Sequence, residues 1–543
     1  MNTNVTIPRN VIIYGLCIPL AMLMGYLLTT PLDLVSLGGL LGVMGLLLVP
    51  IFLRWHHTFL IVAWNAALNA FFLPGQPRAW MLLAAVSAAF SILDRIMNKE
   101  KRLQQVPMLM WPLLFLAGVI LVTAWARGGI GLRSVGGASY GGKKYMEPLF
   151  AIIGFFALSW KRIPLHKAAL YTALFLLSGL TNALSNLAYS LQIYWLFWLF
   201  PVDLAVMQIQ ADYTLNDRAF FRLTGVAFAC LAPFCFLLAR HGVAGIFQFK
   251  DNWSLIPFRF RNGFYINQPF RLLGFLAAVG LSTVGGFRSM PILLGLLFVI
   301  QFCLERLYRT RLLYILVGAG LAAGLAILPF TNRLPSVMQR AISFLPDKVV
   351  KLSPAVRYDA WVSTDWRLRM WSVVVDEIPR YFWLGKGYSV DPTDLYLARE
   401  SSRRGFITDW DAAYIAGDYH SGPLSILIPL GIFGTIGFVW LLVAGLIALA
   451  RNYRYGPPEL SRVNAFLLAF FIAQVIFYFG VFGAFSNALW TFTGTLGMSV
   501  SLNGGVLKSA RSREEIPASE PATATAPPPP PTGGLEAAGA AGA

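Results

Sequence analysis

The sequence predicts an all-α membrane protein that crosses the bilayer many times. Hydrophobic residues make up 57% of its 543 positions and only 13% are charged, which is about half the charged share of a soluble domain. The apolar residues fall in long runs, and a helix needs roughly 20 such residues to span a bilayer. A soluble enzyme or a nucleic-acid-binding protein would place many more charges on a polar face, so both classes are excluded.

About 12 to 14 apolar runs are long enough to cross a bilayer as helices. They begin near Val11, Leu34, Thr58, Ala79, Pro107, Glu147, Lys167, Leu223, Phe270, Ser289, Leu312, Gly422, Ala465 and Asn487. A shorter run at 193–201 predicts an interfacial or half-length segment. No small-residue cleavage site follows the first run, so we expect it to anchor the chain.

Lysine and arginine in the short loops predict the orientation, because these residues are retained on the cytoplasmic side. With the N-terminus inside, the inner loops hold 23 Lys and Arg, whereas the short outer segments hold 8. Both termini are therefore expected in the cytoplasm. More than half of the 43 Lys and Arg are then explained as a topology signal, so the net charge of +18 by itself says little about function. The expected partner is a lipid bilayer, and no nucleic acid is expected.

One outer loop, residues 331–421, is long enough to fold. Its 12 Lys and Arg are nearly balanced by 11 Asp and Glu. Two stretches within it, 334–345 and 365–378, have helical apolar spacing. One face of the second stretch carries Leu368, Trp371, Val375 and Ile378. We expect short amphipathic helices that lie on the outer membrane surface and cap the bundle.

The chain thus divides into four parts. Residues 1–330 and 422–503 hold the transmembrane helices, on either side of the large loop 331–421. The composition changes in the last part, 504–543, where Pro527 to Pro531 are five consecutive prolines. A segment of that composition does not bury a core, so we expect a disordered cytoplasmic tail.

One histidine falls on the outer side of this topology. His420 lies where the large loop re-enters the membrane. The other histidines fall in or beside inner loops: His56, His57, His166 and His241. A histidine can accept or donate a proton near neutral pH, and Asp418, two residues upstream, could orient the ring. An interfacial histidine without a chemical role is the alternative interpretation.

Three arginines occupy outer helix ends on the same side. Arg222 precedes the apolar run that begins at Leu223, and Arg288 lies in the tight turn GGFRS. Arg367 belongs to the helix expected in the large loop. Arginine suits a phosphate because its planar guanidinium stays charged and donates paired hydrogen bonds. Each arginine could instead extend to lipid headgroups.

The glycine-rich segment 127–145 adds two lysines to the outer side. Its glycines free the backbone to approach a ligand, and Lys143 and Lys144 either bind an anion there or contact headgroups. The sequence contains no GxxxxGKS/T phosphate loop, no HExxH motif and no paired-cysteine site. The outer carboxylates lack metal-ligand spacing, so the sequence predicts neither a metal nor another cofactor.

Two longer motifs surround these residues. The first, HSGPLSILIPLGIFG, begins at His420 and has Gly431 eleven residues later and Gly434 three residues after that. The second is RLRMWSVVVDEIPRYFWLGKG, an arginine, a tryptophan four residues later and a helix that ends in Gly-x-Gly. Its positions are Arg367, Trp371, Gly385 and Gly387. Both motifs resemble those of the O-antigen ligase and polymerase-like membrane proteins.

The arginines in FRLTG and GGFRS, Arg222 and Arg288, also resemble family positions, and the resemblance covers roughly 217–437. The chain departs from the family at Ser421, where asparagine is frequent. The resemblance implies a GT-C-like helical bundle that transfers a glycan on the outer face of the bacterial inner membrane. The implied donor is a polyprenyl-diphosphate-linked glycan. The implied acceptor is a hydroxyl on lipid A core, a growing polysaccharide or a protein, and no metal is implied.

The resemblance also implies roles for the candidate residues. Arg222, Arg288 and Arg367 would hold the diphosphate, and His420 would take the acceptor's proton or orient the acceptor, with Asp418 tuning it. Further substrate contacts are expected from Lys143, Lys144 and Trp371. Ligase and polymerase activities both remain open. A lipid-linked glycan flippase or other transporter is an alternative, although it predicts repeat halves and midplane charges. A polysaccharide-assembly scaffold is the third option.

Overall fold

The computed structural model describes residues 18–26, 29, 34–73, 75–98, 103–129, 141–200, 223–247, 268–346, 348–391, 393, 396–397, 400, 414 and 417–507. This described part is helical and contains no strand; its one β contact is an isolated bridge between Asn69 and Arg78. The all-α class is therefore confirmed.

The elements follow one another through the described part of the chain. The α-helices are α2 (Leu34–Trp64), α3 (Ala79–Met97), α4 (Pro107–Arg127), α5 (Gly142–Ser159), α6 (Leu165–Leu177), α7 (Ala183–Ser190), α9 (Thr224–Phe247), α10 (Gln268–Ser282), α11 (Ser289–Leu304), α12 (Arg311–Ile327), α13 (Ser336–Ala341), α14 (Pro354–Asp376), α15 (Ile378–Tyr381), α18 (Gly422–Tyr455), α19 (Ser461–Gly480) and α20 (Phe485–Asn503). The 3₁₀ segments are η2 (Ser178–Asn182), η3 (Tyr194–Trp198), η4 (Thr283–Gly285), η5 (Leu307–Arg309), η6 (Leu328–Arg333) and η7 (Pro458–Leu460).

Among the described residues, 8 helices are long and apolar enough to cross a membrane. They are Leu47–Trp64, Ala79–Met97, Pro107–Arg127, Leu165–Ser190, Thr224–Phe247, Arg311–Arg333, Gly422–Tyr455 and Pro458–Gly480. Two shorter apolar helices are Phe270–Gly285 and Ser289–Leu304. The chain is thus a multi-pass membrane protein. The spans expected from Ser289 and Gly422 begin at those residues, as α11 and α18.

One pair of expected spans is wrong. The runs near Leu34 and Thr58 belong to the single helix α2, which continues through the polar stretch at His56 and His57. These histidines stay inside the bundle because both find partners there. His56 Nδ1 lies 2.8 Å from Ser87 Oγ, and His57 Nε2 lies 2.9 Å from the Leu158 carbonyl oxygen. The run from Val11 lies mostly outside the described residues, as do 508–543, so the four-part division stays a prediction.

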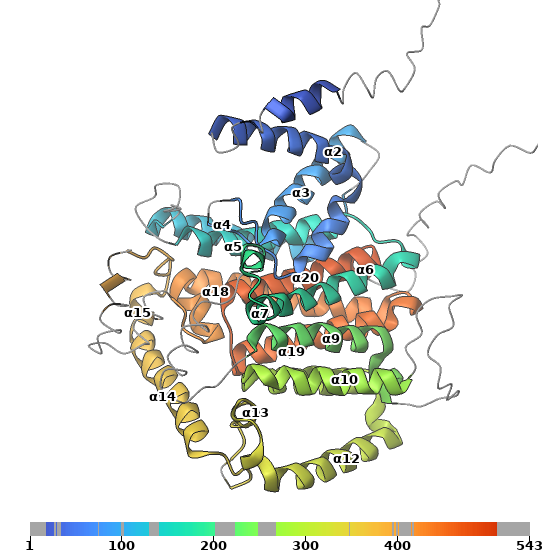
Figure 1. Ribbon diagram of the computed structural model, residues 1–543, viewed down its shortest axis with the longest axis vertical. Helices are drawn as coiled ribbons and strands as arrows, with labels where there is room; N and C mark the ends of the chain where they lie inside the picture. The colour runs from blue at the N-terminus through green and yellow to red at the C-terminus, as the bar shows by residue number, and fades with distance from the viewer. Residues whose placement is uncertain are drawn as a thin grey trace, which may run out of the picture.

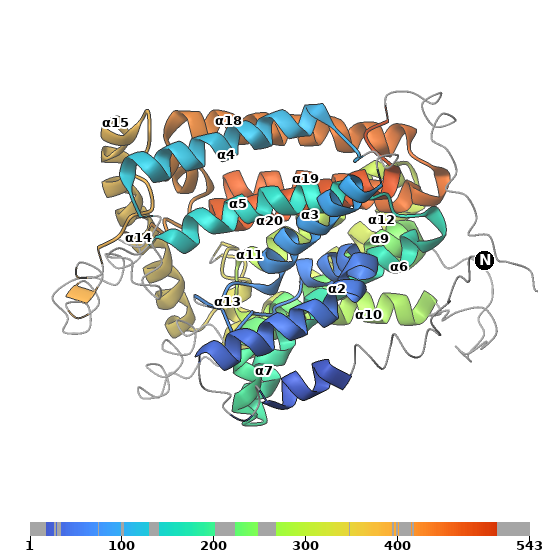
Figure 2. The ribbon, with the colours of Figure 1, turned by 90° about the horizontal axis from the view of Figure 1, so that it is seen from above.

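The long helices form one bundle with a helix of the large loop across its end. Helices α4, α5, α18, α19 and α20 run side by side, and α14 lies across one end of them (Figures 1 and 2). We call this the α14 end of the bundle. Because successive spans alternate in direction, this end collects the start of α5, α11 and α18 together with the ends of α4 and α19.

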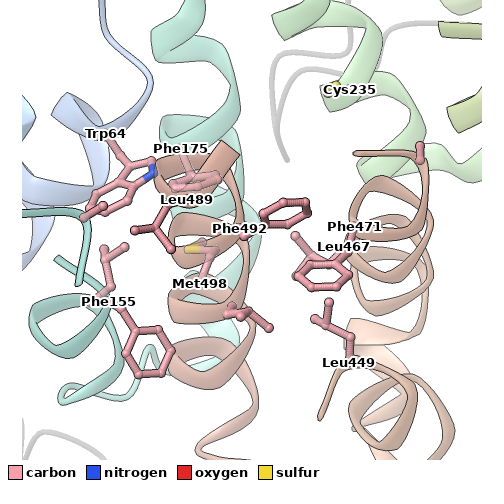
Figure 3. Close-up of a cluster of buried hydrophobic side chains, with 14 of the residues drawn as sticks. Trp64, Phe155, Phe175, Cys235, Leu449, Leu467, Phe471, Leu489, Phe492 and Met498 are labelled. Atoms are coloured by element: carbon pink, nitrogen blue, oxygen red, sulfur yellow. The ribbon is translucent and has the colours of Figure 1, made fainter. Parts of the chain in front are cut away.

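The core that aligns these helices lies around α20. A Cβ atom on Gly494 would lie 1.9 Å from the indole nitrogen of Trp64, and one on Gly154 would lie 2.4 Å from the same ring system. Only glycine leaves room for Trp64 between α5 and α20. On the other side of α20, Phe492 packs on Phe471 of α19 with ring centroids 4.8 Å apart (Figure 3). This packing fixes which helix ends lie next to α14.

The large loop folds into helices, but with bounds that differ from those expected. Helix α13 falls inside the expected 334–345, whereas α14 begins at Pro354, well before the expected 365. Ser353 explains this start, since its side chain accepts a hydrogen bond of 3.4 Å from the Val356 N–H and Pro354 takes the first helical position.

The buried face of α14 also differs from the expected one. Leu368 and Val375 are exposed, whereas Met370 and Val374 are fully buried. The sequence from 370 to 375 is apolar nearly all round the helix, so spacing alone allows more than one face. Contact of Met370 and Val374 with Ile428 of α18 selects the face that is used.

Candidate functional site

A break inside α18 joins the large loop to the bundle. Gly431 has φ 66° and ψ −165°, a backbone conformation that is essentially restricted to glycine. Three backbone hydrogen bonds of 2.7 to 3.0 Å connect α18 around this break with the segment that follows α15. Their donors are Lys386, Gly387 and Ile432, and their acceptors are the carbonyls of Ile428, Pro429 and Phe382, respectively. The loop is therefore anchored to α18 by main-chain contacts.

Gly385 allows the closest of these contacts. Its φ is 80°, and a Cβ atom there would lie 2.2 Å from the Pro429 carbonyl oxygen. Its own carbonyl accepts a 2.9 Å hydrogen bond from Arg127 Nε of α4. The glycines at 385 and 431 thus allow two backbones to touch, and they set the position of the chain that leads to His420.

Trp371 holds the residue that precedes His420. Its indole N–H donates a 2.7 Å hydrogen bond to the Tyr419 carbonyl oxygen. Tyr419 is itself buried against Met370, Val374 and Ile428. The polar atom of Trp371 therefore contacts the protein chain, and its effect on a substrate would be exerted through Tyr419 and His420.

His420 lies between two aromatic rings at the α14 end. Its ring centroid is 5.2 Å from that of Trp366 on α14 and 5.4 Å from that of Phe482, which follows α19. Its φ of 50° is left-handed, which costs a non-glycine residue of the order of 1–3 kcal/mol and persists only where the surroundings impose it. The aromatic rings and the strained backbone fix the imidazole in one place.

Asp418 is the carboxylate nearest to this imidazole. Its Oδ1 lies 3.3 Å from His420 Nδ1, although the two groups are not aligned as a hydrogen bond and Nδ1 has no hydrogen-bond partner. Burial lowers the pKa of His420, as does the positive charge of Arg367, while Asp418 acts in the opposite direction. His420 is therefore neutral near pH 7, in the form that can accept a proton.

Two of the three candidate arginines, Arg288 and Arg367, lie close to each other at α14. Arg288 Nη1 donates a 3.3 Å hydrogen bond to Thr364 Oγ1, one turn before Arg367. Burial lowers the pKa of Arg367, the like charge of Arg288 lowers it further, and Asp418 raises it. Arg367 Nε is buried and has no hydrogen-bond partner. Two like charges held together with an unpaired buried donor favour an anion at this point.

The turn GGFRS places Arg288 next to α14. Gly286 has φ 64°, and a Cβ atom on Gly285 would lie 2.6 Å from Ala227 Cβ of α9. Arg222 lies outside the described residues. The residue after it, Leu223, donates a 3.3 Å backbone hydrogen bond to the carbonyl of Val284, directly before this turn.

The two lysines of α5 have different surroundings. Lys143 is exposed. Lys144 is half-buried, and its Nζ lies 3.8 Å from the place a Cβ atom would take on Gly417, next to Asp418. The structure thus brings Lys144 to the segment that carries His420, whereas Lys143 faces outward.

Several residues of this site carried no signal in the sequence. Trp366 adjoins Arg367, but no motif marks it, and Thr364 and Phe482 reach the site only through the packing of α14 and the end of α19. Among the described residues, no group of three or more His, Cys, Asp or Glu side chains could hold a metal ion.

These observations define the class of the protein. It is a multi-pass helical membrane protein with two arginines, a histidine and an aspartate gathered at one end of its bundle, where α14 of the large loop crosses it. Residues 270–439 match the family model described as O-antigen ligase, so over this segment the chain is similar to the O-antigen ligase-like family. The matched segment contains Arg288, Arg367 and His420. A search of the curated proteins found no match.

The family gives the protein its general function. Its members are O-antigen ligase and polymerase-type glycosyltransferases, and the match supports an enzyme of that general kind, for which the family implies lipid-linked glycans and their acceptors as partners.

Proposed function

We propose that the protein moves a glycan from a polyprenyl-diphosphate carrier to an acceptor hydroxyl, on lipid A core or on a growing polysaccharide, in the manner of an O-antigen ligase. The reaction would take place on the periplasmic face of the bacterial inner membrane, with both termini in the cytoplasm. The main support is the buried, unpaired Nε–H of Arg367, which lies beside Arg288 and close enough to His420 to lower the pKa of that imidazole.

The residues at the α14 end would divide the chemistry between them. The acceptor oxygen forms a bond to the anomeric carbon of the glycan, and the bond from that carbon to the carrier's phosphate oxygen breaks. His420 takes the acceptor's proton on Nε2, and the nearby Asp418 carboxylate stabilises the positive charge that the imidazole then carries. The leaving diphosphate gains negative charge, which Arg288 and Arg367 offset. Arg222 and Lys143 would extend this cationic surface toward the diphosphate or glycan.

Reconstitution in proteoliposomes tests the proposal. The donor would be labelled undecaprenyl-diphosphate-linked glycan extracted from bacterial membranes, and the acceptor lipid A core. We expect transfer by the wild type, and a loss of about a hundred- to a thousandfold in kcat for Arg367→Gln, because a buried donor to a developing oxyanion is removed. Arg288→Lys should lose less, since it keeps the charge but not the planar fork.

A matched control lies on the same helix. Arg369 is 65% exposed and pairs with Asp365 at 2.8 Å, so Arg369→Gln should leave transfer unchanged. Movement of the donor across the membrane without transfer by the wild type would instead identify a transporter. Addition of one glycan to lipid A core, or of many units to a glycan, would separate ligase from polymerase.

Trp371 provides a milder prediction. Trp371→Phe keeps an aromatic ring but removes the N–H that holds Tyr419, leaving a buried carbonyl unsatisfied. We expect kcat about tenfold lower, the donor KM unchanged, and a free energy of unfolding lowered by about 1–3 kcal/mol. A raised donor KM with unchanged kcat would mean that Trp371 contacts the glycan directly.

A further inference from the structure

Three polar side chains, those of Glu377, Lys386 and Tyr414, contact one another near the segment that carries His420. Lys386 Nζ lies 3.3 Å from Glu377 Oε2 and 3.5 Å from Oε1, and the Tyr414 hydroxyl donates a hydrogen bond to the same carboxylate. The Lys386 ammonium also lies over the Tyr414 ring, 4.7 Å from its centroid. We call these three residues the polar clasp. Its ion pair is largely buried, with side-chain exposures of 33% and 20%.

The clasp connects the elements that determine where His420 lies. Glu377 directly follows α14, and the Lys386 N–H donates a 2.7 Å hydrogen bond to Ile428 of α18. The Tyr414 carbonyl accepts a 2.9 Å hydrogen bond from Gly417, which begins the turn into Asp418. Tyr414 and residues 417–420 are therefore both connected to α14 or to the residue that follows it, through Tyr414 to Glu377 and through Tyr419 to Trp371.

We propose that Glu377, Lys386 and Tyr414 are positioning residues that hold His420 in its reactive place, an inference that rests on the proposed function. None of the three contacts the imidazole, so each acts through the turn that precedes it. Such support is needed because the backbone of His420 is strained and returns to an ordinary conformation when its surroundings loosen. A shift of about 1 Å at a catalytic group can cost about a hundredfold in rate.

The protonation of the clasp suits this role. Burial raises the pKa of Tyr414, and its hydrogen bond to Glu377 raises it further. The hydroxyl therefore keeps its proton throughout the range in which the enzyme would work, and it donates to a charged carboxylate. Hydrogen bonds of this charge-assisted kind are about twice as strong as neutral ones.

Conservative variants test the inference in the same proteoliposome assay. Tyr414→Phe, Glu377→Gln and Lys386→Met each remove one contact with little change of shape, and Lys386→Arg keeps the charge. We expect the first three to lower kcat about tenfold without changing the donor KM, and Lys386→Arg to restore most of the rate. Arg369→Gln, which breaks an ion pair elsewhere on α14, should match the wild type.

The pH dependence separates positioning from a general loss of stability. When the segment loosens, water reaches His420, burial depresses its pKa less, and the acidic limb of kcat/KM moves to higher pH. A variant that only unfolds more readily loses active protein while its limb stays in place. His420→Ala is the reference variant, and we expect it to be inactive. If the three clasp variants then keep the wild-type kcat, the clasp has no positioning role. The same conclusion follows if they lose rate while the acidic limb of the pH profile stays in place. If His420→Ala is itself active, the proposed function fails first.

Discussion

Replacement of His420 by alanine is expected to lower the rate of glycan transfer by about a hundred- to ten-thousandfold, the usual contribution of a positioned general base. The donor KM should change little, because the arginines that we assign to the diphosphate are retained. His420 lies outside the membrane spans and is partly exposed, at 27%, so the thermal unfolding temperature should stay close to that of the wild type. Transfer at the wild-type rate would remove His420 from the mechanism.

The pH profile of the same reaction gives an independent measurement. Neutral His420 is the active form, so activity falls as the pH drops through its pKa. Burial places that pKa below the usual 6.5, so the wild type should keep its activity to a lower pH than an unperturbed histidine would allow. Arg367 lowers this pKa and Asp418 raises it. Arg367→Met should thus move the acidic limb to higher pH, and Asp418→Asn to lower pH. Shifts in the same direction would contradict this electrostatic arrangement.

Alanine at Gly431 is expected to detach the large loop from α18. Its φ of 66° and ψ of −165° are nearly closed to a residue with a Cβ atom, and that atom would lie 2.4 Å from the Trp383 carbonyl oxygen. The strain and the clash together should lower the free energy of unfolding by about 3 kcal/mol or more. Transfer should be lost as well, because the backbone contacts around Gly431 carry the chain toward His420.

Thermal unfolding in detergent, together with limited proteolysis of residues 331–421, measures this effect. Gly295 of α11 is the matched control, since a Cβ atom there meets nothing within 4 Å. Gly295→Ala should be neutral or slightly stabilising, as alanine favours a helix over glycine by about 1 kcal/mol. Equal stability of the two variants would show that the break in α18 is not needed.

The sequence alone determined the class and the starts of several spans, and it singled out Arg288, Arg367 and His420 as candidate site residues. Hydropathy and charge report which segments prefer lipid, so α11 and α18 begin where their apolar runs begin. Arg288, Arg367 and His420 were recognisable because a charged or titratable group beside a long apolar run is costly and tends to be functional. The glycines of the motifs were visible too, although not the contacts that require them.

Only the tertiary structure decided which of those residues meet. The apolar spacing of α14 allowed several faces, and packing on Ile428 selected the one that carries Trp371 to Tyr419. The aromatic rings beside His420 come from α14 and from the end of α19, which are far apart in the chain. The polar clasp joins residues that lie 9 and 37 positions apart, and no local pattern encodes either encounter. Tertiary contacts also decided the course of α2, because partners on other helices keep His56 and His57 inside the bundle. Solvent preference is a local property of a sequence, whereas the place of a side chain depends on every helix that packs against its own.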